Sequence, residues 1–328
     1  MEHEMRHPTF LGADLGGTKL LLGEVTADGN LLRQKSYPSG ALSQTQALEL
    51  ISDSVKDFLE NARPREEPLP CAMGVGLVGR VDPGKGLWME IDRVRKEEFP
   101  VARLLEERFG LPCAIDNDVR SAAKAEMRFG QGKDCKNLIY LNIGTGIAAG
   151  IVVNGKLVHG GHCNAGEVGH TGSGVALHVP CVCGRQDCVE MVSAGVGLDA
   201  SARLLREQYP DTTLPIPEDG SRVSAAEIFS RYDSDLLCTL LTNNAAQGIS
   251  NLIMNLVRQS DPELVVLGGG LLSNELLYQK VLAGLNAHTV RFVTRGIVRT
   301  GLDPAHIGVI GAACNAMEKL EQERKKSI

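Results

Sequence analysis

The sequence lacks the features of a membrane protein or a nucleic-acid-binding protein. No run approaches the roughly 18 consecutive apolar residues that a membrane span requires, and residues 1–10 contain no apolar segment of a signal peptide. The chain has 34 basic and 40 acidic residues, a net charge of -6, and no Lys/Arg block before the C-terminal tail. We therefore expect a cytoplasmic protein without a membrane or nucleic-acid partner.

A low-complexity linker is also missing, although 328 residues exceed the usual size of one hydrophobic core. Residues 11–32 and 139–158 share one pattern: an apolar strand runs into Asp14 or Asn142, then a Gly/Thr turn, then a second apolar strand that ends at a hairpin signal. This repetition indicates an internal duplication. It predicts two related domains that surround a cleft.

The remaining patterns alternate strands with helices, which predicts an α/β fold with sheets covered on their faces. Helices are expected over residues 47–62, 101–110 and 236–259, and buried strands over 71–79 and 263–272. Residues 112–130 read as a strand that leads into a helix. Residues 306–325, HIGVIGAACNAMEKLEQERK, give the same expectation of a strand leading into a helix.

The first glycine turn, DLGGTK at residues 14–19, is suited to phosphate, because backbone N–H groups in such a turn can surround phosphate oxygens. The spacing of a Walker A loop is absent, and residues 74–79 lack the context of a dinucleotide site. Asp14 could hold Mg²⁺ against the phosphates, or it could be a simple Asx-turn residue. Lys19 could contact phosphate or be a solvated strand residue.

The stretch IDNDVRSAA places Asn117 and Asp118 between an apolar strand and a helix, where sites in open α/β sheets gather. A carboxylate at this position could accept a proton from an attacking hydroxyl group during phosphoryl transfer. The alternative is that Asp118 serves as a helix N-cap. Glu167 and His170 in NAGEVGHTG, together with Glu190, suit the hydroxyl groups of a polar substrate better than an apolar ligand.

The nine cysteines fall into two groups. Six scattered residues are expected to be reduced thiols, most of them buried: Cys71, Cys113, Cys135, Cys163, Cys238 and Cys314. The other three, in a C-x-C-x4-C spacing, could bind one structural Zn²⁺ ion together with a histidine: Cys181, Cys183 and Cys188. Spacing leaves the fourth ligand open among His178, His170, His162 and Cys163. A disulfide or a redox sensor is the less favoured alternative.

Six segments taken together resemble the ROK family of sugar kinases and repressors: DLGGTK, IDNDVRSAAKAE, IGTGIAAGIVVNGKL, GEVGH, CVCGRQDCVEMVSAG and LGGGL. The resemblance covers residues 9–316. It implies a duplicated actin-like/hexokinase (ribonuclease H-like) fold, transfer of the γ-phosphoryl group of Mg-ATP to a hexose or N-acetylhexosamine, and a homodimer, with a tetramer as the alternative. Repressor members carry a helix-turn-helix before the first loop. About ten residues precede it here, so the resemblance implies a kinase.

The resemblance also implies roles for individual residues. Asp118 matches the catalytic base, and Asn117 matches its neighbour on the sugar. Further substrate-binding residues are Gly79, Glu167, His170 and Glu190. The phosphate and Mg²⁺ loops correspond to Asp14, Gly16, Gly17, Thr18, Gly144, Thr145 and Gly146, and Lys19 is added to this cofactor-binding group. The adenosine side corresponds to Gly268, Gly269 and Gly270. The family's zinc histidine lies in Glu-x-Gly-His, so the metal ligands would be His170, Cys181, Cys183 and Cys188.

The chain departs from the family pattern at three places. Val78-Gly79 stands where Pro-Gly is usual, and Val119-Arg120 follows the base where a small residue and Asn are usual. Residues 86–100, GLWMEIDRVRKEEFP, differ from the stretch that normally supplies an Asn to the sugar. An unusual substrate is therefore expected, and Glu90, Asp92 and Arg93 are the residues of interest in this stretch.

We therefore predict an ATP-dependent sugar kinase in which Asp118 deprotonates the C6 hydroxyl group of the sugar. The N-terminal domain is expected over residues 1–119, rejoined by the C-terminal helix at about 311–328, and the C-terminal domain over 120–310. The alternatives are a non-catalytic sugar sensor and a transcriptional regulator that lacks its DNA-binding domain. ATP, Mg²⁺ and structural Zn²⁺ are the expected cofactors.

Overall fold

The computed structural model describes residues 8–64, 66–91 and 96–326. The chain forms two compact units. Unit 1 comprises Met1–Asp134, His159–Asn164 and Gly301–Ile328, and unit 2 comprises Cys135–Val158 and Ala165–Thr300. Among the described residues, no helix combines the length and the apolar character that a bilayer span would need.

Unit 1 is built around a five-stranded sheet in the order β3-β2-β1-β4-β8. Its strands are β1 (Thr9–Leu15), β2 (Lys19–Thr26), β3 (Leu31–Pro38), β4 (Met73–Leu77) and β8 (Cys113–Asn117). The first three form an antiparallel meander, whereas β4 and β8 run parallel to β1. A second, three-stranded sheet consists of β5 (Arg80–Asp82), β6 (Leu87–Glu90) and β7 (Lys96–Phe99).

The two faces of the unit 1 sheet follow from the alternation of side chains along its strands. On one face, Leu11 and Val75 belong to an apolar cluster that includes residues of α1 (Gln44–Asn61) and α2 (Val101–Phe109). Helix α1 begins at a capping box formed by Ser43 and Gln46, as the capping rules predict. Helix α2 ends at Gly110 in the left-handed conformation, so both predicted helices are confirmed.

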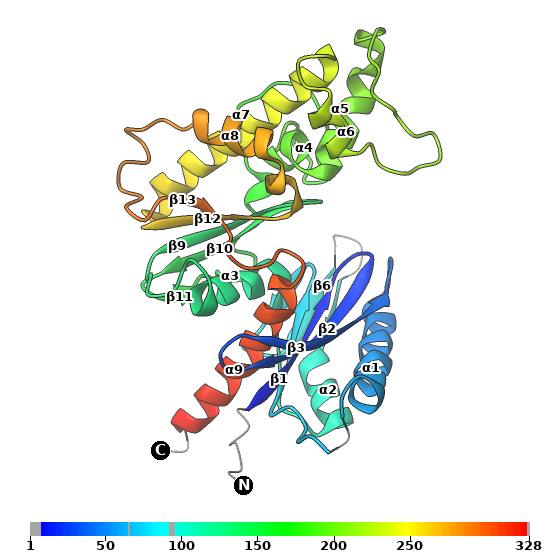
Figure 1. The fold of residues 1–328 in the computed structure, drawn as a ribbon, viewed down its shortest axis with the longest axis vertical. Helices are drawn as coiled ribbons and strands as arrows, with labels where there is room; N and C mark the ends of the chain where they lie inside the picture. The colour runs from blue at the N-terminus through cyan, green and yellow to red at the C-terminus, as the bar shows by residue number, and fades with distance from the viewer. Residues whose placement is uncertain (1–7, 65, 92–95, 327–328) are drawn as a thin grey trace. The chain divides into compact units, whose positions relative to one another are not determined.

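The other face of the sheet lies against α9 (Ile307–Lys326), drawn in red in Figure 1. Glycines make this approach possible. A Cβ atom on Gly74 would lie 1.7 Å from the carbonyl oxygen of Ala312, and one on Gly12 would lie 2.1 Å from that of Val309. Helix α3 (Asp118–Phe129) packs on α9 as well. The sheet and the two helices are therefore close-packed against one another, with α9 in contact with both the sheet and α3.

Unit 2 repeats the sheet of unit 1 in the order β11-β10-β9-β12-β13. Its strands are β9 (Leu138–Ile143), β10 (Ile147–Val153), β11 (Lys156–Leu157), β12 (Leu264–Gly268) and β13 (Ile297–Arg299). Again the first three form an antiparallel meander and the last two run parallel to the first of them. Because order and directions match strand by strand, the duplication predicted from residues 11–32 and 139–158 is confirmed.

Helices of unit 2 enclose an apolar core on its sheet. They are α4 (Val189–Ser193), α5 (Gly195–Leu205), α6 (Ala225–Ser230), α7 (Leu236–Ser260) and α8 (Glu275–Ala283), with the 3-10 helices η1 (Val168–His170), η2 (Arg206–Gln208) and η3 (Gly270–Ser273). The long α7, capped by Asp235, confirms the helix predicted over residues 236–259.

Two sequence-based expectations differ from the structure. Residues 307–326 are helical throughout, so the strand expected at the start of this segment is wrong. From Ile307 to Met317 this helix is almost entirely buried, and the polar positions that would have revealed a helical period are missing. Unit 1 also extends to Asp134, beyond the expected boundary at residue 119, because α3 packs on α9.

The close contact between β4 and α9 generates a stability prediction. We expect Gly74→Ala to lower the stability of the protein by about 1–3 kcal/mol, because the added methyl group must displace the α9 backbone. Gly161→Ala is the control, since nothing lies within 4 Å of its Cβ position. Thermal unfolding measures both variants. If the Gly74→Ala protein is as stable as the control, α9 can shift to accommodate the methyl group without loss of stability, which contradicts the prediction.

Candidate active site

The carboxyl ends of the parallel strands β1, β4 and β8 lie at the same edge of the unit 1 sheet. The register pairs Asp14 with Gly76 and Gly76 with Asp116. The Cβ position of Gly76 lies 3.5 Å from Oδ1 of Asp14 and 3.6 Å from Cα of Asp118. Gly76, which has no side chain, therefore lies beside both predicted functional carboxylates, those of Asp14 and Asp118. Unit 1 brings Asp14 and Asp118 to one edge, where ligands of such sheets bind.

Helix α3 begins directly after β8, and its capping residue is Asn117. The Asn117 side-chain oxygen accepts hydrogen bonds from the backbone amides of Val119, at 3.0 Å, and Arg120, at 3.2 Å. The Asn117 amide nitrogen donates to the carbonyl oxygen of Gly79 at 3.1 Å. Asp118 is the first helical residue, so the alternative that Asp118 is the N-cap is wrong. Its half-buried carboxylate accepts from the Val119 amide at 3.0 Å.

Asp14 is close to the first turn of α9. A Cβ atom on Gly308 would lie 2.1 Å from Oδ2 of Asp14. Burial raises the pKa of the Asp14 carboxyl to about 6, and the positive charge of Lys19 opposes this rise. A partly buried carboxylate with a raised pKa is a group that a cation would stabilise in its charged form.

The first glycine turn joins β1 to β2. It is closed by a hydrogen bond from the Gly16 amide to the carbonyl oxygen of Lys19 at 3.0 Å. Gly17, Thr18 and Lys19 are exposed. The turn therefore presents backbone groups and one ammonium group to solvent beside Asp14, an arrangement that can hold phosphate oxygens.

The corresponding turn in unit 2 joins β9 to β10 and contains Gly144, Thr145 and Gly146. The Gly144 amide donates to the carbonyl oxygen of Gly146 at 3.0 Å. Glu190, on α4, accepts a hydrogen bond from the Ile147 amide at 2.9 Å, so its carboxylate is bound to the base of this turn. A Cβ atom on Gly146 would lie 2.7 Å from Oε2 of Glu190, so a larger residue there would displace this carboxylate.

The third glycine turn follows β12. Gly269 has φ +88, and its Cβ position lies 2.3 Å from the carbonyl oxygen of Ile143, so glycine is required there by conformation and by space. Gly268 packs on the ring of Tyr140, and Gly270 has nothing within 4 Å of its Cβ position. Since β12 pairs with β9, this turn and the Gly144–Gly146 turn belong to the same edge of the unit 2 sheet.

Glu167 and His170 border the short helix η1 of unit 2. Glu167 is exposed and immediately precedes the helix, whereas His170 is half-buried at its end. The Gly166 backbone before them is close to β10, because its Cβ position lies 2.1 Å from the carbonyl oxygen of Ala149. The loop that carries both side chains is thereby fixed on the sheet.

The structure brings His170 together with the three clustered cysteines. The ligand atoms of His170, Cys181, Cys183 and Cys188 all lie within 4.8 Å of one another. Nδ1 of His170 is 3.5 Å from Sγ of Cys181, and Sγ of Cys183 is 3.3 Å from Sγ of Cys188. Four ligands at about 2.0–2.3 Å from a tetrahedral ion have similar separations, so the donor set fits one metal ion.

The other candidates for the fourth ligand are not members of this group. His178 is exposed with φ 60, and its backbone amide donates to Asp187. The Asp187 carboxylate also accepts from the Val179 amide and so shapes the loop. A backbone hydrogen bond from Arg185 lowers the pKa of the Cys183 thiol to about 6, which favours the thiolate that binds metals.

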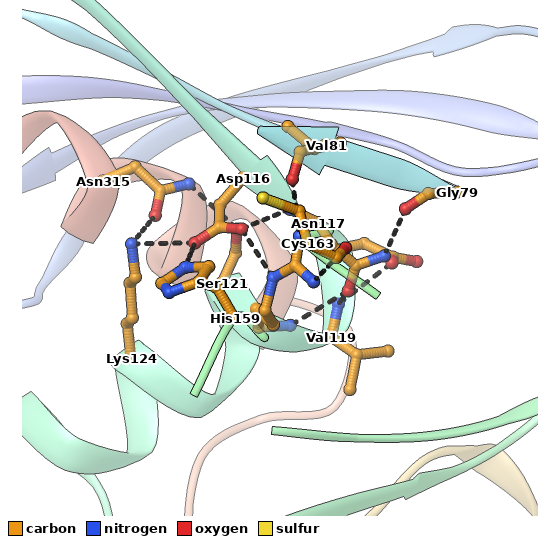
Figure 2. A network of polar contacts seen from close by, with 12 residues as sticks. Gly79, Val81, Asp116, Asn117, Val119, Ser121, Lys124, His159, Cys163 and Asn315 are labelled. Carbon is orange, nitrogen blue, oxygen red and sulfur yellow. Dashed lines mark hydrogen bonds and ion pairs between the residues drawn. The ribbon is translucent and has the colours of Figure 1, made fainter. Parts of the chain in front are cut away.

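Sequence reasoning missed a buried polar network beside Asp118. Asp116, fully buried at the end of β8, contacts Arg120, Lys124 and His159 (Figure 2). The only signal in the sequence was Arg120, noted as a departure from the family pattern. A cavity of about 580 Å³ borders Lys124 and His159, but its lining does not include Asp118. Of the residues singled out for selectivity, Glu90 pairs with Arg80 at 3.1 Å, and Asp92 and Arg93 lie outside the described residues.

Known proteins match nearly the whole chain. A glucokinase of Halalkalibacterium halodurans is 29% identical over 325 residues, covering 94% of this chain and 97% of the relative. A beta-glucoside kinase of Listeria monocytogenes is 30% identical over 310 residues, covering 93% and 96%.

Solved structures and the family model agree with these relatives. The crystal structure of a ROK family glucokinase from Streptomyces griseus in complex with glucose and AMPPNP has a TM-score of 0.75 at 25% identity, covering 94% of this chain and 99% of that chain. The model of the ROK family matches residues 10–319. The chain therefore belongs to the ROK family.

Proposed function

We propose that the protein is an ATP-dependent sugar kinase that transfers the γ-phosphoryl group of Mg-ATP to the C6 hydroxyl of a hexose or N-acetylhexosamine. One observation carries this proposal: Asp118 is at the carboxyl end of β8 as the first residue of α3, while Asn117 performs the capping that Asp118 would otherwise perform. Helix capping therefore does not account for a carboxylate at this position, which supports a catalytic role for Asp118.

Asp118 acts as the general base. Its carboxylate accepts the proton of the sugar hydroxyl as the hydroxyl oxygen forms its bond to the γ-phosphorus and the bond to the leaving ADP breaks. Phosphoryl transfer requires mainly orientation and charge stabilisation, so the base must be held still. The hydrogen bonds of Asn117 to the first turn of α3 and to Gly79 supply this rigidity.

The three glycine turns bind the nucleotide. The turns at Gly16–Lys19 and Gly144–Gly146 present backbone amides for phosphate oxygens, and Gly268–Gly270 borders the adenosine. Asp14, whose burial favours a bound cation, holds Mg²⁺ directly or through water. When bound, Mg²⁺ neutralises the phosphate charge. The similarity to the Streptomyces griseus glucokinase, whose structure is a complex with glucose and AMPPNP, supports a nucleotide role for these turns.

Glu167, His170 and Glu190 bind the sugar hydroxyl groups. The support is their placement on rigid backbone, together with the glucose and beta-glucoside substrates in the names of relatives. The residues that are expected to select among sugars are Gly79, Glu90, Asp92 and Arg93. Gly79 has φ +84, and the carbonyl oxygen of Glu90 lies 2.3 Å from its Cβ position, so the two positions are in contact.

The metal bound by His170 and the three cysteines is Zn²⁺ in a closed, structural site. Three thiolates and one imidazole are a preferred donor set of tetrahedral zinc. The imidazole nitrogen of His170 that does not bind the metal would remain for the sugar. We further propose that the kinase is cytoplasmic and forms a homodimer; the homodimer rests on the family alone.

The base assignment predicts that Asp118→Asn lowers kcat by about 10²–10⁴-fold, because the amide cannot accept the proton. The substitution preserves shape, so thermal stability and sugar affinity, measured by calorimetry, should change little. Asp134→Asn is the matched control, since Asp134 is exposed with φ 62, which Asn tolerates. A coupled ATP assay over hexoses and N-acetylhexosamines measures turnover. Near-normal turnover by Asp118→Asn contradicts the assignment.

The raised pKa of Asp14 predicts a specific pH dependence. Because its folded-state pKa, about 6, exceeds its ordinary value of 3.8, protonated Asp14 stabilises the fold. That contribution is complete below about pH 4 and is lost as pH rises through about 6. Asp14→Asn cannot ionise, so near pH 8 it should be more stable than the wild type by roughly 1–3 kcal/mol, partial solvent exposure reducing the full value.

The stability gain of Asp14→Asn should shrink as the pH falls toward about 4, and the variant should lose Mg-ATP binding. Unfolding by denaturant across this pH range, with nucleotide titration by calorimetry, measures both effects. A stability difference that is independent of pH would contradict the burial of an ionisable Asp14.

The zinc assignment predicts about one zinc per chain by elemental analysis. Cys181→Ser should lose the metal and raise the KM for sugar, since His170 would no longer be held, while Cys71→Ser, altering an exposed thiol outside the cluster, should retain both. Purified protein with only traces of zinc would refute the assignment, whatever its activity.

A further inference from the structure

A short segment, residues 159–164, belongs to unit 1 although the chain on both sides of it belongs to unit 2. We name it the crossover segment. Three side chains of unit 1 hold it. Nε2 of its own His159 is 3.1 Å from Oδ2 of Asp116. Arg80 donates to the carbonyl oxygen of residue 162 at 3.3 Å, and Arg120 donates to that of Cys163 at 3.2 Å. The chain reaches Glu167 three residues after the segment ends.

Arg120 connects the crossover segment to three other parts of unit 1. Its side chain is 4% exposed and uses its donors in different directions. Nε donates to Oδ1 of Asp116 at 2.7 Å, Nη2 donates to the carbonyl oxygen of Val81 at 3.0 Å, and Nη1 donates to Cys163 (Figure 2). A planar guanidinium group can make these contacts at once, which an ammonium group cannot.

Asp116 is the acceptor on which this network depends. Its carboxylate, with 0% exposure, accepts from Arg120, Lys124 and His159 and from the backbone amide of Asn117. Burial alone would raise the pKa of Asp116, but Lys124, His159 and Arg120 hold it well below its usual range. The carboxylate therefore stays charged, and a buried charge keeps its partners in place because losing them is costly.

The network also fixes the backbone on both sides of the base. Asp116 and Arg120 lie two residues before and two residues after Asp118, and they are bonded to each other. Between them, the backbone amide of Asn117 donates a hydrogen bond to the Asp116 carboxylate. The side-chain oxygen of Asn117 accepts one from the first turn of α3. Arg80 in turn pairs with Glu90 at 3.1 Å, so both arginines that hold the crossover segment are themselves oriented. We call these two arginines the clamp.

We propose that Arg120 and Arg80 are positioning residues for sugar phosphorylation. Arg120 orients the base Asp118 through Asp116 and Asn117, and both arginines fix the crossover segment from which the chain continues to Glu167 and His170. This inference rests on the proposed kinase function. It predicts that loosening the clamp impairs sugar use and turnover while nucleotide binding, which uses the glycine turns, is spared.

The test measures kcat and the KM values for D-glucose and ATP on the full chain. Arg120→Lys keeps a positive charge beside Asp116 but cannot donate to both Val81 and Cys163. We expect kcat to fall and the KM for glucose to rise, with a combined loss of about 10- to 100-fold in kcat/KM for the sugar. The KM for ATP should stay within about twofold, because a misplaced base does not alter nucleotide contacts.

Arg128→Lys is the matched control. Arg128 lies on the same helix, but its ion pair with Glu321 at 2.6 Å joins α3 to α9 at the far end from Asp118. This control should retain wild-type values of all three constants. The protein's one tryptophan, Trp88, donates to the carbonyl oxygen of Val78 next to Gly79, so its fluorescence reports whether the fold around the clamp is intact.

Arg80→Gln is the second variant, and it tests the positioning role even if Arg120→Lys does not fold. Arg80 is 25% exposed, and removing it leaves the partners of Asp116 unchanged. A raised KM for glucose with an unchanged KM for ATP and unchanged Trp88 fluorescence supports the proposal. If a folded variant has the wild-type kcat and KM values, the positioning role is refuted, but the proposed kinase function is not. A wild-type protein that phosphorylates no sugar of the panel refutes the proposed function, and the positioning role falls with it.

Discussion

The parallel register of β1, β4 and β8 is the constraint on which the chemistry of unit 1 depends. It brings the ends of three strands to one edge of the sheet, so Asp14 and Asp118, more than a hundred residues apart in the chain, flank the same glycine, Gly76. The register is in turn held from behind by α9, which can approach the strands only because Gly12 and Gly74 have no side chains. Packing on one face of the sheet thus determines which groups meet at its edge.

Three carboxylates near this edge have different environments, which fits the different roles proposed for them. Asp116 is surrounded by donors and cations, which keep it ionised and make it a fixed structural charge. Asp14 is partly buried with Lys19 as its charge partner, and its raised pKa supports the cation-binding role proposed for it. Asp118, between the capping Asn117 and the clamped Arg120, is oriented by its neighbours. Differences in environment of this kind are what separate the roles of chemically identical groups.

The duplicated sheet of unit 2 carries different side chains at the corresponding positions. Asn142 stands where unit 1 has Asp14, and the corresponding glycine turn is bound by Glu190 on α4. Cys188 stands at the N-terminal boundary of α4 and is also a member of the metal cluster, so the cluster, α4 and the Gly144–Gly146 turn are mechanically linked. A metal in the cluster would therefore order the turn as well as His170, since rigid second contacts orient functional groups.

The sequence by itself determined the duplication, the α/β class, most helices and the residue types of the site, because period, glycine turns and cysteine spacing are local signals. Cysteine spacing left the fourth ligand open among His178, His170, His162 and Cys163; the family resemblance pointed to His170, and the fold placed His170 beside the cysteines. The sequence did not indicate that residues 307–317 are helical, because almost all of them are buried and the segment has no polar positions with a helical period. The partners of Asp116 were equally invisible, since Arg120 and Lys124 on α3 and His159 in the crossover segment meet the end of β8 only when these parts pack together.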